Sequence, residues 1–187
     1  IGVAPYDVLH IGISKTFDIL YGNASIMVSL TVLIVDILLG ESIGIAMIID
    51  AFVVGKAVDF FNWVDIIPVP KTLLGSIVMI FVGIVILCYT QYFYMYAALG
   101  CGPRDTLLVG LKRIFKGIPI GLVSIFILVM STLIGYLLGG PVGIGTLICA
   151  FCTGPIMQVI FDLVKFDATA VKHQKIMETV KVIRGEK

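Results

Sequence analysis

Charged side chains are scarce in this sequence. Lys, Arg, Asp and Glu make up 13% of its 187 residues, whereas apolar residues make up 59% and the mean hydropathy is +1.13. In an average soluble domain about 25% of the residues are charged. The composition therefore excludes a soluble domain and predicts an integral membrane protein, for which the lipid bilayer is the first partner.

Residues that commonly bind metals or perform catalysis are few and scattered. His10 and His173 lie far apart, and the sequence shows no recognisable nucleophile–base pair, metal-ligand cluster or phosphate-binding loop. Cys149 and Cys152 have CxxC spacing, but they lie within an apolar run and lack the βαβ context of a redox motif. Cysteine in such a run usually packs as a small hydrophobe. We therefore expect no enzymatic activity, no metal and no cofactor.

The sequence contains an internal repeat. Ile1–Phe17 reads IGVAPYDVLHIGISKTF, and Leu99–Phe115 reads LGCGPRDTLLVGLKRIF. Identical residues recur 98 positions apart, among them Pro5 and Pro103, Asp7 and Asp105, Leu9 and Leu107, Gly12 and Gly110, and Phe17 and Phe115. Further along, Gly40 and Gly139, Gly44 and Gly143, and Gly55 and Gly154 recur 99 positions apart. Both the motif and its spacing recur, so the two halves of the chain are expected to fold alike.

Apolar runs alternate with turns along the chain. Because a spanning helix needs about 20 residues, these runs predict five spans, near residues 25–39, 43–63, 72–99, 118–138 and 142–164. Two short amphipathic helices are predicted at 4–20 and 103–116, where a proline followed by an aspartate suits a helix N-terminus. Glycine-rich turns at 40–42 and 139–141 and a loop at 65–71 separate the spans, and a charged amphipathic tail follows at 165–187.

The distribution of basic residues predicts the topology. They gather between Arg104 and Lys116 and again between Lys165 and Lys187. We attribute both clusters to the positive charge of cytoplasmic loops rather than to nucleic-acid binding. With both clusters inside, the spans between them place the first short helix on the outer face. The two motif copies are therefore expected on opposite faces of the membrane.

The repeat and the topology together predict an all-α integral membrane fold made of an inverted repeat. Each repeat would hold three spans and one short amphipathic helix, and an odd number of spans forces the two repeats into opposite orientations. The span equivalent to 72–99 would precede Ile1 and is missing from this chain, so five spans are visible. We expect a first repeat at 1–64, a second repeat at 65–164 and a cytoplasmic tail at 165–187.

The repeated motif also carries a resemblance to a known family. The second copy, Gly102-Pro103-Arg104-Asp105 with Leu107, and its degenerate first copy, Ala4-Pro5-Tyr6-Asp7 with Leu9, resemble the YczE-like (YczE/YitT) group of bacterial multi-pass membrane proteins. The resemblance covers essentially the whole chain and implies a six-helix protein of the bacterial plasma membrane, without an established chemistry. The chain departs from the pattern at Ala4, which replaces glycine, and in lacking the first span.

Ionisable residues within predicted spans are the strongest functional signal. A charge at the bilayer centre costs about 2.5–3.5 kcal/mol on insertion scales and normally faces a partner or a wet cavity. Asp50 has no basic residue three or four positions away, which favours a functional role. Lys56 and Asp59 are one helical turn apart, and we favour an intrahelical ion pair near the outer interface over a functional pair. Asp36 lies nearer the inner end and is expected to snorkel.

The polar residues of the short helices leave two interpretations open. Asp7 and Asp105 either cap their helices, which is worth about 1 kcal/mol each, or mark two broken-helix N-termini beside a shared pathway. Arg104 has Tyr6 at its matching position and is expected to contact an anionic group or a lipid headgroup. His10 contributes to the polar side of the first short helix.

A stripe of aromatic residues marks the end of the longest span. Tyr89, Tyr92, Phe93 and Tyr96 recur at helical spacing, with Gln91 to one side. Such a stripe either lines a site for an organic cation or flat solute or packs as an interfacial belt, and we favour the belt.

These signals favour a transporter that moves a small solute by alternating access between the two repeats, coupled to a proton or other ion. Asp50 is the candidate carrier of that charge. The substrate or ion pathway is predicted to draw on eleven residues: Asp7, His10, Asp50, Lys56, Asp59, Tyr89, Gln91, Tyr92, Tyr96, Arg104 and Asp105. The alternative is a non-transporting membrane subunit that docks a cytoplasmic partner through the tail at 165–187. A homodimer is compatible with either function.

Overall fold

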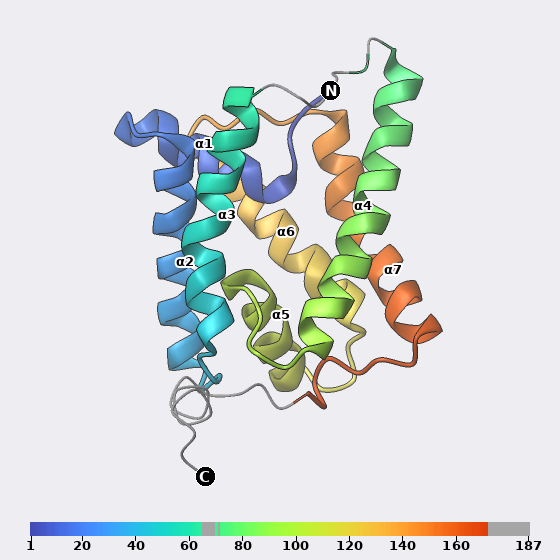
Figure 1. Ribbon diagram of the computed structural model, residues 1–187. Coiled ribbons are helices and arrows are strands. Elements are labelled where there is room, and N and C mark those ends of the chain that lie inside the picture. The colour runs from blue at the N-terminus through green and yellow to red at the C-terminus, as the bar shows by residue number, and fades with distance from the viewer. Residues whose placement is uncertain (65–69, 71, 172–187) are drawn as a thin grey trace.

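The structure, a computed structural model, describes residues 1–64, 70 and 72–171. Within these ranges the chain forms α-helices and no strand (Figure 1). The helices are α1 (Pro5–Phe17), α2 (Tyr21–Leu38), α3 (Ile45–Val64), α4 (Leu73–Tyr96), α5 (Pro103–Ile114), α6 (Ile120–Leu137) and α7 (Ile144–Leu163). The predicted all-α fold is confirmed. Most of the predicted loop at 65–71 and of the predicted tail lies outside the described residues, and the described part of the tail, 165–171, holds no helix.

Four helices are long and apolar enough to cross a membrane: α2, α4, α6 and α7. The fifth predicted span, α3, reaches 20 residues but carries three ionisable side chains, Asp50, Lys56 and Asp59. Because of these three charged side chains, α3 lacks the low charge content that the other four helices share. By length and composition, the described residues support a membrane protein with four candidate spans.

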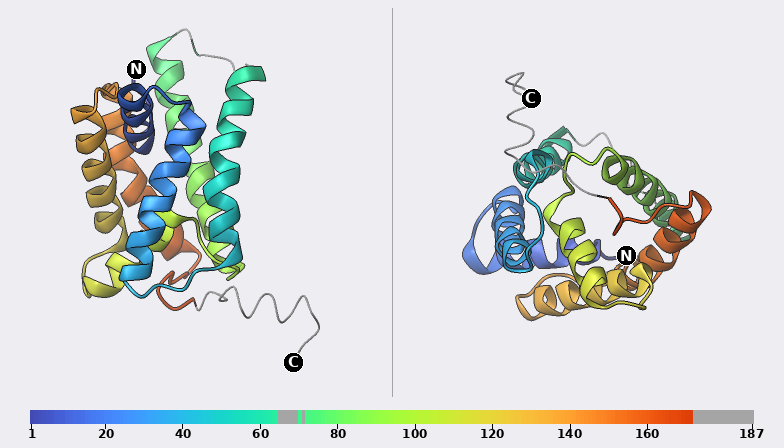
Figure 2. Two further views of the ribbon diagram at one scale, coloured as in Figure 1. Left: turned by 90° about the vertical axis from the view of Figure 1, so that its left-hand side faces the viewer. Right: turned by 90° about the horizontal axis from the view of Figure 1, so that it is seen from below.

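The two short helices lie at opposite ends of the bundle. Helix α1 is at the end where α2 begins and α6 finishes, whereas α5 is at the end where α2 finishes and α6 begins (Figure 1). Seen from below, the longer helices surround α5 (Figure 2). Contacts join α1 to α2 and α6, and likewise join α5 to α6 and α2. Both short helices are thus held between the longer ones.

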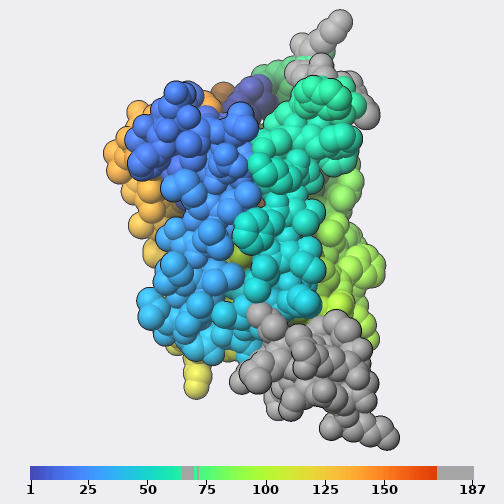
Figure 3. Space-filling view, turned by 60° about the vertical axis from the view of Figure 1, so that its left-hand side comes forward, coloured from blue at the N-terminus to red at the C-terminus, as the bar shows by residue number. Residues whose placement is uncertain are grey.

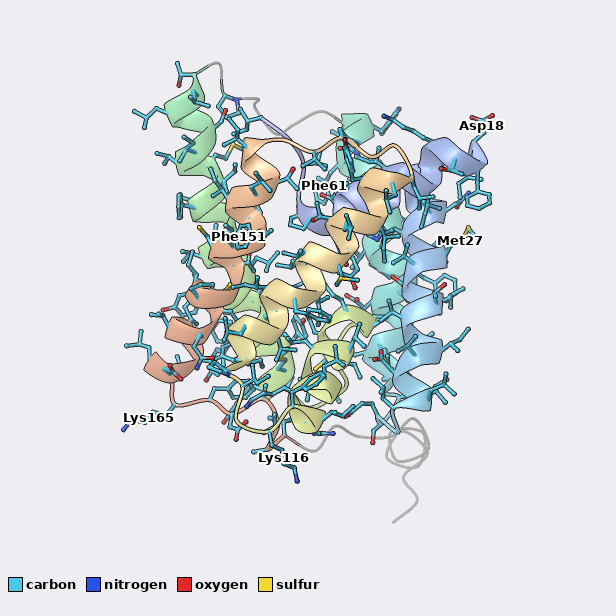
Figure 4. The ribbon with its side chains drawn as sticks, turned by 180° about the vertical axis from the view of Figure 1, so that it is seen from behind. Asp18, Met27, Phe61, Lys116, Phe151 and Lys165 are labelled. Carbon is cyan, nitrogen blue, oxygen red and sulfur yellow. The ribbon has the colours of Figure 1, made fainter. Side chains whose placement is uncertain are left out.

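The outer sides of the long helices are apolar and exposed. Helices α2 and α3 lie side by side along one such face (Figure 3). Met27 of α2 and Phe151 of α7 are both exposed, and charged residues such as Asp18 and Lys116 lie at the two ends of the molecule (Figure 4). Lipid chains are the natural neighbour for side walls of this composition.

Glycines at matching places in the two halves make matching close contacts. A Cβ added to Gly44 would lie 2.5 Å from the carbonyl oxygen of Leu99, and one added to Gly143 would lie 2.5 Å from the carbonyl oxygen of Ile1. In both places the segment before a short helix packs directly against the start of a long helix from the other half. No side chain fits at either contact, which accounts for glycine at both positions.

A similarly close contact holds α1 against α6. A Cβ on Gly12 would lie 2.6 Å from the carbonyl oxygen of Gly135, and a Cβ on Gly135 would lie 2.5 Å from the carbonyl carbon of Val8. The backbones of the two helices therefore touch, as small residues allow in membrane proteins. This crossing fixes the position of α1 in the bundle.

We expect Gly135→Ala to destabilise the protein by about 1–3 kcal/mol, because the added methyl group overlaps the backbone of α1. Gly83 in α4 is the matched control, since a Cβ there meets no atom within 4 Å. Alanine is favoured over glycine in a helix by about 1 kcal/mol, so Gly83→Ala should be neutral or stabilising. Thermal unfolding in detergent measures both variants, and equal Tm values would contradict the close crossing.

Candidate functional site

The first turn of α5 carries a buried charged pair. Gly102 is the N-cap and Pro103 the first helical residue, which places Arg104 and Asp105 in the opening turn. Asp105 is 7% exposed. Its Oδ1 accepts hydrogen bonds from Nε2 of Gln91 at 2.9 Å and from Nε of Arg104 at 3.1 Å. Asp105 therefore joins α5 to α4.

Asp50 of α3 reaches the same turn. Its carboxylate lies so close to the Cα atom of Gly102 that a Cβ there would collide with it. The N-terminus of a helix carries partial positive charge and free amide groups, which favour a carboxylate at this place. In the other half, Ala4 matches Gly102 and Cys149 matches Asp50. The half that has a Cβ at the N-cap position therefore lacks the aspartate.

The two motif copies meet at this site. The guanidinium carbon of Arg104 lies 5.7 Å from the centre of the Tyr6 ring, a cation–π contact. Tyr6 and Arg104 occupy the same position of the repeated motif, 98 residues apart. We refer to Tyr6, Asp50, Gln91, Arg104 and Asp105 as the central cluster. With both acids ionised, it holds two negative charges and one positive charge.

A second polar group lies beside the central cluster on α1 and α2. The Tyr21 hydroxyl donates to Asp7 Oδ1 at 2.6 Å, and Nδ1 of His10 lies 3.1 Å from the same hydroxyl. The His10 ring meets Tyr21 and Tyr6 edge-on, with centroids 5.4 and 5.8 Å apart. Polar and aromatic contacts thus continue from Tyr21 through His10 and Tyr6 to Arg104.

The hydrogen bonds of Asp7 and Asp105 bear on the two interpretations left open for them. Asp7 accepts a bond from Tyr21 of α2, and Asp105 accepts one from Gln91 of α4. Each aspartate therefore links its short helix to a long helix.

Asp36 is the residue that the sequence analysis misjudged. It was expected to snorkel toward the inner interface, but its side chain is 0% exposed. Neither carboxylate oxygen has a hydrogen-bond partner among the described residues. In the repeat Asp36 matches Gly135, which lies at the crossing of α6 with α1, but that crossing is visible only in the structure.

Lys56 and Asp59 lie apart from the central cluster. Their charged groups are 3.9 Å apart, and 58% of the Lys56 side chain is exposed. Lys56 also donates to Asn23, and Asp59 accepts from the backbone amide of Gly22. The pair therefore ties α3 to the start of α2, a structural role.

The tyrosine stripe also faces away from the central cluster. Tyr92 packs against Tyr96, Phe93 and Phe166, with the Phe166 ring edge-on at 5.1 Å. Tyr89 lines a shallow apolar groove with Pro155 and other residues of α7. Only Gln91 of this segment reaches Asp105. The contacts fit the packing interpretation rather than a lining of the central cluster.

A separate cavity of about 280 Å³ opens at the end of the bundle near α5. Its wall includes Lys112, Gln158, Phe161, Asp162, Phe166 and Asp167. Hydrogen bonds from the hydroxyl and amide of Thr169 hold the pKa of Asp167 below its usual value. None of the eleven residues predicted for the pathway lines this cavity.

Basic residues at one repeated position tie each short helix to a turn of the other half. Arg113 of α5 donates to both carboxylate oxygens of Glu41, at 2.6 and 2.9 Å. Lys15 of α1, 98 residues earlier, donates to the carbonyl oxygen of Gly139 at 3.3 Å. The tie at the α5 end is therefore an ion pair in which Nη1 of Arg113 contacts both carboxylate oxygens, whereas the tie at the α1 end is one hydrogen bond.

We expect a double-mutant cycle of Glu41→Gln and Arg113→Gln to give a coupling energy of about 1 kcal/mol in the free energy of unfolding. The hydrogen bonds are charge-assisted, but 41% of the Arg113 side chain is exposed, which limits the gain. Lys116→Gln, at an exposed position after α5, is the control and should not couple to Glu41. A coupling energy of zero between Glu41 and Arg113 would show that this ion pair does not stabilise the protein.

Comparisons with known proteins identify the family of this chain. The family described as a family of unknown function, DUF6198, matches residues 1–162. The chain belongs to this family. The membership confirms the resemblance to YczE-like proteins, because the uncharacterized membrane protein YczE of Bacillus subtilis is 29% identical over 84% of this chain and 73% of its own length.

Two further relatives carry no described function. An uncharacterized protein of Haemophilus influenzae is 29% identical over 88% of this chain and 74% of its own length. The uncharacterized protein YyaS of Bacillus subtilis is 23% identical over 88% of this chain and 83% of its own length. No solved structure matches the chain. Members of this family are thus related to a membrane protein, and the activity has to be argued from the site.

Proposed function

We propose that this DUF6198 protein is a membrane transporter that moves a small solute by alternating access, coupled to a proton or another ion. The observation that carries the proposal is the central cluster, where two acids, one arginine and an amide meet inside a predominantly apolar bundle. Intramembrane ionisable groups are costly and usually mark substrate or ion pathways.

The proposal includes an inverted repeat. Helix contacts in one half have counterparts in the other: α1–α6 corresponds to α5–α2, and α2–α3 corresponds to α6–α7. The short helices lie at opposite ends of the bundle (Figure 1). Their first turns are joined by the cation–π contact between Arg104 and Tyr6. Half-helices whose N-termini converge at the junction of inverted repeats are a known basis of solute sites in transporters.

In this mechanism the solute binds beside Arg104 and Asp105, and Asp50 carries the coupling charge. The carboxylate of Asp50 lies against Gly102 at the positive end of α5, so a change in its protonation alters the balance of charge in the cluster. The ties formed by Arg113 and by Lys15 would open in turn as the halves rock against each other. The proposal assigns no enzymatic activity to the chain.

The charges at the two ends orient the protein in this proposal. The α5 end carries Lys112, Arg113, Lys116 and Lys165, whereas the basic residues described at the α1 end are Lys15 and Lys56, accompanied by Asp18 and Asp59. The positive-inside rule then places the α5 end and the C-terminus in the cytoplasm.

The experiment is a ligand-dependent thermal shift on the purified full-length protein. Small metabolites and ions are screened at two pH values, because a ligand that binds the native state raises its stability by about 2.7 kcal/mol at one hundred times its Kd. A stabilising solute whose effect is lost in Asp50→Asn but kept in Asp18→Asn supports the proposal. Absence of any stabilising solute would favour the alternative, a membrane subunit that binds a cytoplasmic partner through its C-terminal tail.

A further inference from the structure

Asp36 differs from the other well-buried acid of the described residues. Asp105 is nearly as buried, but it accepts hydrogen bonds from Gln91 and Arg104. Asp36 is 0% exposed, and neither of its oxygens accepts a hydrogen bond from a described residue. An ionised carboxylate in this position would be shielded from bulk water and would have no hydrogen-bond donor among the described residues.

The place of Asp36 explains how it became buried. It lies in the last turn of α2, and α2 packs against α5. The matching residue of the other half is Gly135, where α6 meets the backbone of α1 with no room for a Cβ. The same crossing thus holds a carboxyl group in one half and only a hydrogen atom in the other.

The titratable groups around Asp36 supply no free positive charge. Glu41 follows in the turn after α2 and adds negative charge, and both of its oxygens are bound by Arg113 of α5. Cys101, just before α5, and Tyr6 of α1 also lie within electrostatic range of Asp36. Arg113, the arginine near Asp36 in this set, is therefore already paired with Glu41.

We propose that Asp36 is a proton-binding site and that its carboxyl group is protonated in the conformation described here. A protonated carboxyl is neutral, so burying it without a partner charge costs far less than burying the ionised form. A metal ion would need several ligands, and the described residues hold no group of three His, Cys, Asp or Glu side chains suited to one. The ligand is therefore a proton.

The role of this proton rests on the proposed transport function. Cys101 lies within electrostatic range of Asp36, of Asp50 in the central cluster and of Glu41 at the α5 end. Asp36 lies in the last turn of α2, at the end of the bundle where Glu41 and Arg113 form their ion pair. When the Glu41–Arg113 ion pair opens, water reaches Asp36, which releases its proton to water and keeps the negative charge.

Infrared spectroscopy of the full chain in lipid nanodiscs tests the protonation directly. The protein is produced with 13C-labelled aspartate carboxyl groups, so that the C=O stretch of a protonated aspartate is recognised by its isotope shift. At neutral pH we expect a protonated-aspartate band that loses intensity in Asp36→Asn. The band should be unchanged in Asp18→Asn, where an exposed aspartate is replaced.

A second variant, Asp36→Glu, controls for a folding defect in Asp36→Asn. Asp36→Glu keeps a carboxyl group, and because glutamate is unlabelled, the Asp36 contribution should move from the shifted to the unshifted C=O position. Absence of a protonated-aspartate band in the wild-type protein, or a band that is unchanged in both variants, would overturn the proposal. The infrared measurement requires no transported solute, so it tests Asp36 independently of transport. A protonated Asp36 in a protein that transports no solute would show that the transport proposal fails while this proposal holds.

Discussion

Replacing Asp50 by asparagine should abolish the pH dependence of uptake while leaving the amount of folded protein in the membrane intact. Asparagine has nearly the same shape as aspartate, so the contact with Gly102 at the start of α5 is kept. It has no ionisable proton, so the cluster can no longer change its charge at this position. The measurement is the initial rate of uptake at acidic and neutral pH, and we expect the ratio of the two rates to fall to about one.

The control for this prediction is Asp18→Asn, which removes an exposed acid at the end of α1. Asp18 has a left-handed backbone with φ of 52°, a conformation that asparagine tolerates well. The control should keep the wild-type pH dependence. Unchanged pH dependence in Asp50→Asn would remove Asp50 from the coupling mechanism.

Replacing Arg104 by glutamine should destabilise the protein by about 3–5 kcal/mol, the cost of leaving a buried charge without its partner. Arg104 is the cation that contacts Asp105 and the Tyr6 ring. Without it, Asp105 and Asp50 remain as two acids near one helix terminus. The loss is measured as the free energy of unfolding in detergent.

The double variant Arg104→Gln with Asp105→Asn separates loss of charge balance from loss of packing. Removing the acid as well should restore a large part of the stability, because the uncompensated charge is gone. Lys116→Gln, which removes an exposed positive charge, should have little effect. A double variant no more stable than Arg104→Gln alone would show that packing of the arginine side chain dominates.

The sequence predicted the helices well, and the differences have local causes. Helix α2 begins at Tyr21 rather than near residue 25, because Gly22 is part of the helix and packs closely against Gly55 and Asp59 of α3. Helix α4 finishes at Tyr96 rather than near residue 99, since Ala98 has φ of 58°. Both differences depend on tertiary contacts or backbone angles that hydropathy does not encode.

The candidate site was predicted residue by residue but not as a group. Asp50, Gln91, Arg104 and Asp105 stood out because polar residues are costly in an apolar chain, and the structure brings these four together. Their meeting point depends on the packing of α3, α4 and α5, which spacing along the chain does not reveal. Asp36 was misjudged for the same reason, because its burial follows from the crossing of α2 and α5.

Solute counterflow in proteoliposomes tests the central claim most directly. Vesicles holding the purified full-length protein are loaded with an excess of an unlabelled solute that stabilises it, and a trace of the labelled solute is added outside. A carrier with alternating access exchanges one solute for the other, so the account predicts a transient accumulation of label above its equilibrium level. Absence of that accumulation for every stabilising solute would contradict the claim that this protein is a transporter.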